Sequence, residues 1–121
     1  MPGNNIIIAA SIEPKVIRSA YLPLTTEAAQ YTAPAGTSVK VATATITNVT
    51  AAAVTVSLSV VPTGATLNGT QRILNSYSLP ANDTLDLSFL KGAMLGPGDF
   101  IAGVASTASA VVLVLTATVH S

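Results

Sequence analysis

The feature that most constrains the fold is a regular alternation of aliphatic and hydroxyl side chains. Val54, Val56, Leu58 and Val60 alternate with Thr and Ser, and the same alternation runs through residues 42–47. A period of two places successive side chains on opposite faces of a β-strand, whereas an amphipathic helix needs a period near 3.6. These segments are therefore predicted to be strands with one buried and one solvent-facing side.

Turn-forming residues separate the strand-like segments. Asn68-Gly69 is a strong signal for a tight hairpin turn, and Gly96-Pro97-Gly98-Asp99 is a second turn. The single helix candidate is Thr25–Gln30, where Thr25 or Thr26 is a possible N-cap. The pattern predicts an all-β, antiparallel β-sandwich, Ig-like or jelly-roll-like, and a partly closed barrel remains an alternative because it has the same alternation. The predicted strands are 38–49, 53–62, 70–79, 84–90, 99–106 and 110–119.

The last predicted strand is apolar on both faces where it begins. Val111, Leu113 and Leu115 belong to one face, and Val112 and Val114 belong to the other. Two apolar faces are typical of a strand in the centre of a sheet or of a strand at an interface.

The first thirty residues have a different pattern, which divides the chain into an arm, 1–30, and a sandwich domain, 31–121. The arm contains Ile6-Ile7-Ile8 and, further along, Pro14 and Pro23 in an otherwise mixed sequence, so an extended segment is expected. It forms either additional edge strands or an arm that reaches a neighbouring subunit. In the second case, deletion of residues 1–24 should leave a folded core and abolish assembly.

Charge is scarce, and this scarcity excludes several classes of partner. Only 8% of the 121 residues are charged, and the formal net charge is zero. The chain therefore has neither the basic surface that binds nucleic acid nor the polybasic cluster that holds a protein to an anionic membrane. Monomers usually rely on more charge for solubility, so either hydroxyl side chains cover the surface or much of it is buried against partners.

The sequence contains no segment expected to direct it to a membrane or out of the cell. The N-terminal apolar run, 6–10, is short and lacks a preceding positive region, and the longest apolar stretch, 108–119, is interrupted by Ser and Thr. A soluble chain without a signal peptide is therefore expected.

No residue pattern predicts catalysis, a metal or a cofactor. There are no cysteines, which excludes disulfides and thiolate chemistry, and the single histidine, His120, lies beside the C-terminus. Asp83 and Asp86 are close in sequence, but they are interpreted as a turn former and a charge on a strand face. Phe89 and Phe100 are expected in the core, so an aromatic platform for a carbohydrate is not expected.

Four segments share turn motifs that occur together in one group of proteins. They are Tyr31-Thr32-Ala33-Pro34-Ala35-Gly36, Ile46-Thr47-Asn48, Leu79–Leu85 and Leu95–Ile101. Their order resembles that of the small β-sandwich virion proteins of tailed bacteriophages. The resemblance covers about residues 31–119. It implies a structural role on the phage particle and no catalytic residues.

The expected function is that of a non-enzymatic capsid decoration (cement) protein. It would bind the major capsid protein at the outer capsid surface of the virion, stabilise the capsid, associate with itself as a homotrimer, and be made in the host cytoplasm. Alternatives are a minor tail, baseplate or fibre component and, from another class, a carbohydrate-binding module. The predicted interface residues are Ile6, Ile7, Ile8, Tyr21, Leu22, Asn68 and Pro97.

Overall fold

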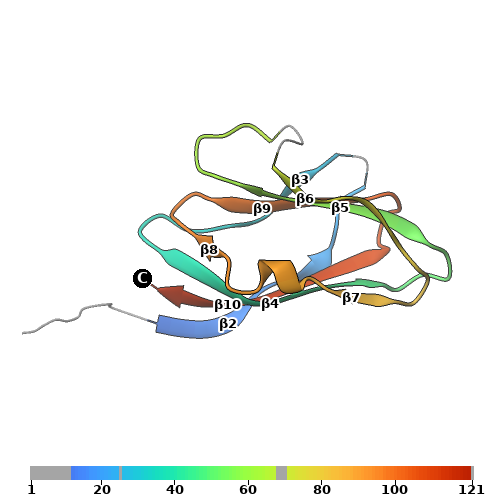
Figure 1. Cartoon of the computed structure of the whole chain (residues 1–121), viewed down its shortest axis with the longest axis horizontal. Helices are drawn as coiled ribbons and strands as arrows, with labels where there is room; N and C mark the ends of the chain where they lie inside the picture. Colours follow the sequence, from blue (N-terminus) through green and yellow to red (C-terminus); the bar gives the residue numbers. More distant parts are fainter. Residues whose placement is uncertain (1–11, 25, 68–70, 121) are drawn as a thin grey trace, which may run out of the picture.

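A computed structural model describes residues 12–24, 26–67 and 71–120 of the chain (Figure 1). Among these residues the regular elements are strands and one short 3₁₀ helix, and no helix is long and apolar enough to cross a membrane. The elements are β2 (Ile12–Tyr21), β3 (Ala28–Thr32), β4 (Ser38–Asn48), β5 (Val54–Val61), β6 (Arg72–Leu79), β7 (Thr84–Asp86), η1 (Ser88–Leu90), β8 (Met94–Leu95), β9 (Phe100–Ala105) and β10 (Val111–His120).

The strands form two sheets that pack face to face (Figure 1). The first, called here the β10 sheet, has the order β2-β10-β4-β7, with β8 also paired to β4. The second, the β5 sheet, has the order β3-β9-β5-β6. Every strand pair is antiparallel. The prediction of an all-β antiparallel sandwich is therefore confirmed.

The alternation seen in the sequence accounts for the core between the sheets. On β10, Val111, Leu113 and Leu115 are completely buried, whereas Val112 and Val114 are half-buried on the outward face. β10 lies between β2 and β4, so its two apolar faces are explained by a central position in the sheet. Burial of one aliphatic side chain contributes roughly 1.5–3 kcal/mol, so this row is a large part of the driving force for folding.

One buried polar residue joins the ends of three strands. Asn48 has no exposed surface, and its side-chain amide donates to the carbonyl oxygens of Ala52 (2.8 Å) and Leu79 (3.1 Å). Its side-chain oxygen accepts the backbone N–H (2.9 Å) and the hydroxyl (2.7 Å) of Thr50. These bonds satisfy backbone groups in the turn between β4 and β5 and at the end of β6.

Part of the segment predicted to be an arm belongs to the sandwich. β2 pairs along its length with β10, and β3 pairs with β9, which is the arrangement of additional edge strands. Arg18 on β2 donates to the side-chain oxygen of Gln30 on β3 at 2.8 Å, a bond that links the edges of the two sheets. Residues 1–11, with Ile6, Ile7 and Ile8, and the predicted turn at Asn68-Gly69 lie outside the described residues.

Two local predictions are wrong. The strand predicted over 84–90 ends at Asp86, because the N–H of Leu90 bonds to the carbonyl of Leu87 and closes a 3₁₀ turn that breaks the alternation. Phe89 consequently points outward with 53% of its surface exposed, instead of entering the core. The helix candidate Thr25–Gln30 does not form a helix in its described part, because residues 28–32 form a strand whose backbone bonds are satisfied by β9.

Candidate functional site

The predicted interface residues lie in different environments. Leu22 is only 2% exposed and belongs to the core, whereas Tyr21 is 49% exposed on the β10 sheet. Pro97 is exposed in the turn between β8 and β9. Tyr21 pairs with Val112, near the start of β10, whereas the turn with Pro97 follows β8, which aligns with the end of β10. The described members of this set therefore do not form one continuous surface.

The outward face of the β10 sheet carries rows of uncharged side chains. The cross-strand register places Thr and Val side chains opposite one another on three strands, and two pairs of hydroxyls, Thr43 with Thr116 and Thr47 with Thr84, are hydrogen bonded. Successive rows are Tyr21, Val112, Thr47 and Thr84; Ser19, Val114, Thr45 and Asp86; and Val16, Thr116 and Thr43. Asp86, on the edge strand β7, is the single charge in these rows, and the next row on the same face, Pro14, Thr118 and Lys40, adds a second charge.

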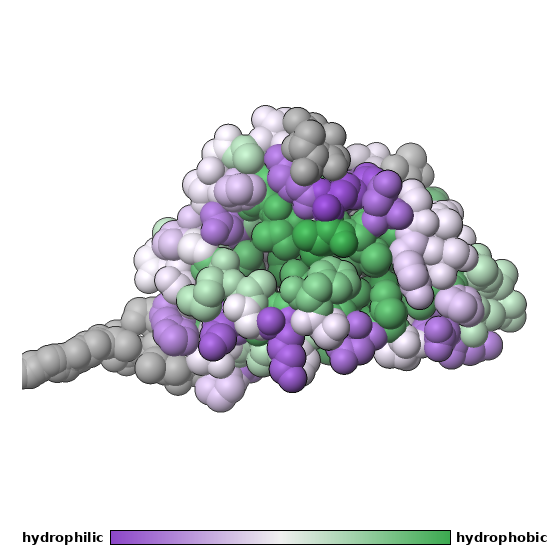
Figure 2. All heavy atoms as spheres, viewed as in Figure 1, coloured by the Kyte–Doolittle hydropathy of each residue, from purple (hydrophilic) through white to green (hydrophobic). Residues whose placement is uncertain are grey.

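A second surface is strongly apolar and lies on one open side of the sandwich. Phe89 on η1 and Met94 on β8 are 53% and 59% exposed, and Leu85 on β7 and Ala93, just before β8, are half-buried. These four residues are called the η1 patch. Figure 2 shows apolar side chains gathered in the middle of the face on which η1 and β8 lie, with hydrophilic side chains above and below. An exposed apolar patch with a polar rim is typical of a protein interaction site.

The η1 patch cannot be recognised from the apolar alternation of residues 85–89, because this alternation is typical of a buried strand face. The N–H of Leu87 donates to the carbonyl of Ala44, and the chain then turns away from β4 at η1. One available signal was Lys91-Gly92, a turn-forming pair directly after the apolar run; Gly92 has a positive φ of 87°.

A network of hydrogen bonds fixes the turn that contains Pro97. The carboxylate of Asp99 accepts the backbone N–H groups of Thr63 and Gly96, both at 2.8 Å, and the hydroxyl of Thr63 at 3.0 Å. These donors hold the pKa of Asp99 below its usual value, and the backbone bond from Thr63 is the largest cause. Asp99 therefore stabilises a turn in its ionised form, in agreement with the turn role expected from the sequence.

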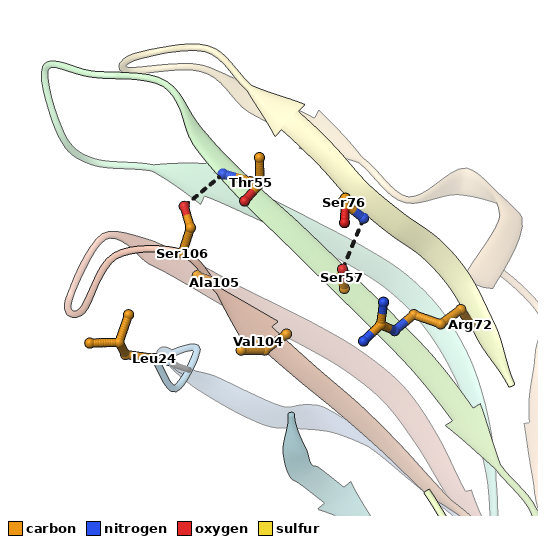
Figure 3. Close-up of a pocket in the computed structure, with 8 residues that line it drawn as sticks. All are labelled: Leu24, Thr55, Ser57, Arg72, Ser76, Val104, Ala105 and Ser106. Atoms are coloured by element: carbon orange, nitrogen blue, oxygen red, sulfur yellow. Dashed lines mark hydrogen bonds between the residues drawn. The ribbon is translucent and has the colours of Figure 1, made fainter. Parts of the chain in front are cut away.

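The β5 sheet carries a hollow of about 350 Å³ on its outer side (Figure 3). Its polar lining comes from β5, β6 and the residue after β9, and its apolar lining comes from β9 and the segment before β3. Two hydrogen bonds join pairs of its lining residues: Ser57 Oγ accepts the N–H of Ser76 (2.9 Å), and Ser106 Oγ accepts the N–H of Thr55 (3.0 Å). The lining residues are Leu24, Thr55, Ser57, Arg72, Ser76, Val104, Ala105 and Ser106.

The titratable residues considered for catalysis do not converge on a common site. Asp83 and Asp86 are exposed at the two ends of the short edge strand β7, whereas His120 is the last residue of β10. Asp86 aligns, through Thr45, with Val114, six residues before His120 along β10. Within residues 12–24, 26–67 and 71–120, no group of three or more His, Cys, Asp or Glu side chains is arranged to hold a metal ion.

Two of the remaining aromatic residues support the sandwich edge. Tyr31 on β3 is half-buried against the core, and burial raises the pKa of its phenol. Phe100 is half-buried at the start of β9, opposite Thr32. Their packing contributes to the attachment of β3 to the rest of the β5 sheet.

Comparisons with protein-family models, with curated proteins and with solved structures found no match for this chain. Its function is therefore argued from its own surfaces.

Proposed function

We propose that the chain is a non-enzymatic structural protein of a tailed-phage virion, which decorates the outer capsid surface and associates with itself and with the major capsid protein. The η1 patch is the observation that carries the proposal. Phe89 and Met94 expose more than half of their surface, although both are large apolar residues whose burial against a partner would be favourable. A partner surface that covers the patch would remove this exposed area from water.

The uncharged rows of the β10 sheet support the same function. A charged group loses its hydration when a partner covers it, and the cores of interfaces are accordingly poor in charge. The rows that contain Val112, Val114 and Thr116 offer β-branched and hydroxyl side chains, with the one charge at the edge. Such a face can be buried with little desolvation cost.

The turn motifs direct the proposal to a phage particle rather than to another assembly. Residues 31–119 resemble the small sandwich proteins of tailed-phage virions, and the chain has only ten charged residues among 121. A homotrimer is the proposed oligomeric state, and closed rotational symmetry would bury the same surface on every copy.

The test is co-sedimentation of the purified protein with undecorated capsids of the phage that encodes it. The wild-type chain is expected to sediment with the capsids and to raise their temperature of disruption. Phe89→Glu and Met94→Glu place a carboxylate on the exposed patch, so we expect each to weaken binding at least tenfold while the circular dichroism spectrum stays unchanged.

Val49→Glu is the matched control, because Val49 is also an exposed aliphatic residue (48%) but follows β4 at the end remote from Met94. It should bind like the wild type. Failure of the wild-type chain to bind capsids, or equal binding by the Phe89 and Val49 variants, would contradict the proposal. Binding to purified tails or baseplates instead would favour the minor tail component as the second candidate.

A further inference from the structure

The hollow on the β5 sheet presents hydrogen-bond donors toward open space. Ser57 and Ser106 each accept a backbone N–H, from Ser76 and Thr55 respectively, so a lone pair of each hydroxyl is already occupied. Among the described residues neither hydroxyl has a recorded acceptor, and both line the hollow (Figure 3). Each O–H group is therefore available to a ligand that accepts hydrogen bonds.

Arg72 adds further donors at the end of the hollow beyond Ser57. Its Nε and Nη2 donate to Oε1 of Glu27 at 3.2 and 3.1 Å, and its Nη1 donates to Oδ1 of Asn75 at 2.7 Å. A guanidinium has five N–H groups, so two remain after these three bonds to described residues. The guanidinium is held in place, because Glu27 is itself fixed by the hydroxyl of Ser59 at 2.7 Å.

The charge of this site is balanced. Arg72 is the one ionisable residue among the eight described residues that line the hollow, and it forms an ion pair at 3.1 Å with Glu27, which lies outside the lining. An anion placed beside Arg72 would therefore also approach the carboxylate of Glu27, which removes much of the attraction. The donors favour oxygen acceptors, and the balanced charge favours acceptors that are neutral.

The remaining wall is apolar. Leu24 and Val104 lie on the side opposite Ser76 (Figure 3), and Leu24 is 47% exposed. A volume of about 350 Å³ is at the lower end of the range for small-molecule sites. It suits a ligand of one or two sugar rings, with C–H groups against the apolar wall and hydroxyl oxygens toward the serines.

We propose that this hollow binds a neutral polyhydroxylated ligand, a mono- or disaccharide, independently of the capsid-binding role. The probes are glucose, galactose, mannose and N-acetylglucosamine, with sodium acetate and sodium phosphate as anionic probes at matched ionic strength. Titration followed by amide NMR shifts should displace the signals of Ser57, Ser76 and Ser106 with at least one sugar, with an affinity in the millimolar range.

Two variants connect the shifts to the site. Ser106→Ala removes one donor and should weaken sugar binding by about fivefold. Leu24→Asp replaces an exposed apolar side chain of the wall and should abolish binding. It tests the site separately from Ser106→Ala, which also removes the acceptor of the Thr55 N–H. Thr107→Ala, the adjacent exposed residue outside the lining, is the control and should bind like the wild type.

Three results would overturn the proposal: no shift with any of the four sugars, shifts with acetate or phosphate alone, or sugar binding that Leu24→Asp leaves unchanged. None of them bears on capsid binding, which is measured with the η1-patch variants.

Discussion

Two polar side chains, Asn48 and Asp99, stabilise turns of this chain through hydrogen bonds to the backbone. Asn48 donates to backbone carbonyls and accepts a backbone N–H, whereas Asp99 accepts two backbone N–H groups, and neither requires a charged partner. In a chain with few charges, these bonds define where strands end. Their roles were only partly visible in the sequence, because a residue in a turn can be recognised from its neighbours whereas its distant partners cannot.

Asn48→Ala should lower the free energy of unfolding by about 3 kcal/mol, because it leaves the carbonyl of Leu79 and the N–H of Thr50 without their side-chain partner. Urea denaturation followed by circular dichroism measures the change. Asn75→Ala is the control: Asn75 is exposed and accepts a bond from Arg72, so its loss should cost below about 1 kcal/mol. Equal losses for the two variants would contradict the structural role of Asn48.

Asp99 predicts a specific pH dependence of stability. Its pKa in the folded chain lies below that of an unfolded Asp, so its contribution is fully present above the unfolded value and is lost as the pH falls through the folded value. Asp99→Asn should therefore lower the melting temperature at neutral pH and reduce the loss of stability between about pH 5 and pH 3. Thermal unfolding across this range tests it; parallel curves for the variant and the wild type would contradict it.

At the scale of elements, most strands could be predicted and their neighbours could not. The predicted segments 38–49, 53–62 and 110–119 correspond closely to β4, β5 and β10, because one buried face imposes the alternation. The pairing of β2 with β10 had no such signal, since contacts between residues about one hundred positions apart leave no local pattern. The alternation alone predicts Phe89 in the core, whereas the local turn of η1 directs it outward.

The position of β2 changes the expected result of truncation. An arm that reaches a neighbouring subunit could be removed without unfolding the core, but removal of residues 1–24 deletes the partner strand of β10 and the buried side chain of Leu22. Loss of Leu22 alone should cost about 2–5 kcal/mol.

We therefore expect the chain without residues 1–24 to be strongly destabilised and the chain without residues 1–11 to keep the sandwich. Urea denaturation of both truncated chains measures this difference. A stable, cooperative sandwich without residues 1–24 would show that β2 is dispensable.

At the scale of the whole molecule, apolar and uncharged surfaces are distributed unevenly. The η1 patch occupies one open side, the uncharged rows of the β10 sheet occupy an outer face, and the polar hollow lies on the β5 sheet (Figures 2 and 3). This separation allows one copy to contact a neighbour through one surface and a small ligand through another. The low charge seen in the sequence is consistent with a chain whose surfaces are covered in an assembly.

The most direct measurement of the proposed role is an electron cryo-microscopy reconstruction of the phage particle proposed to contain this chain. The proposal predicts density for the two-sheet sandwich on the outer capsid surface, with Phe89 and Met94 of the η1 patch covered by a neighbouring subunit or by the major capsid protein. A sandwich located in the tail, or one on the capsid with the η1 patch facing solvent, would contradict it.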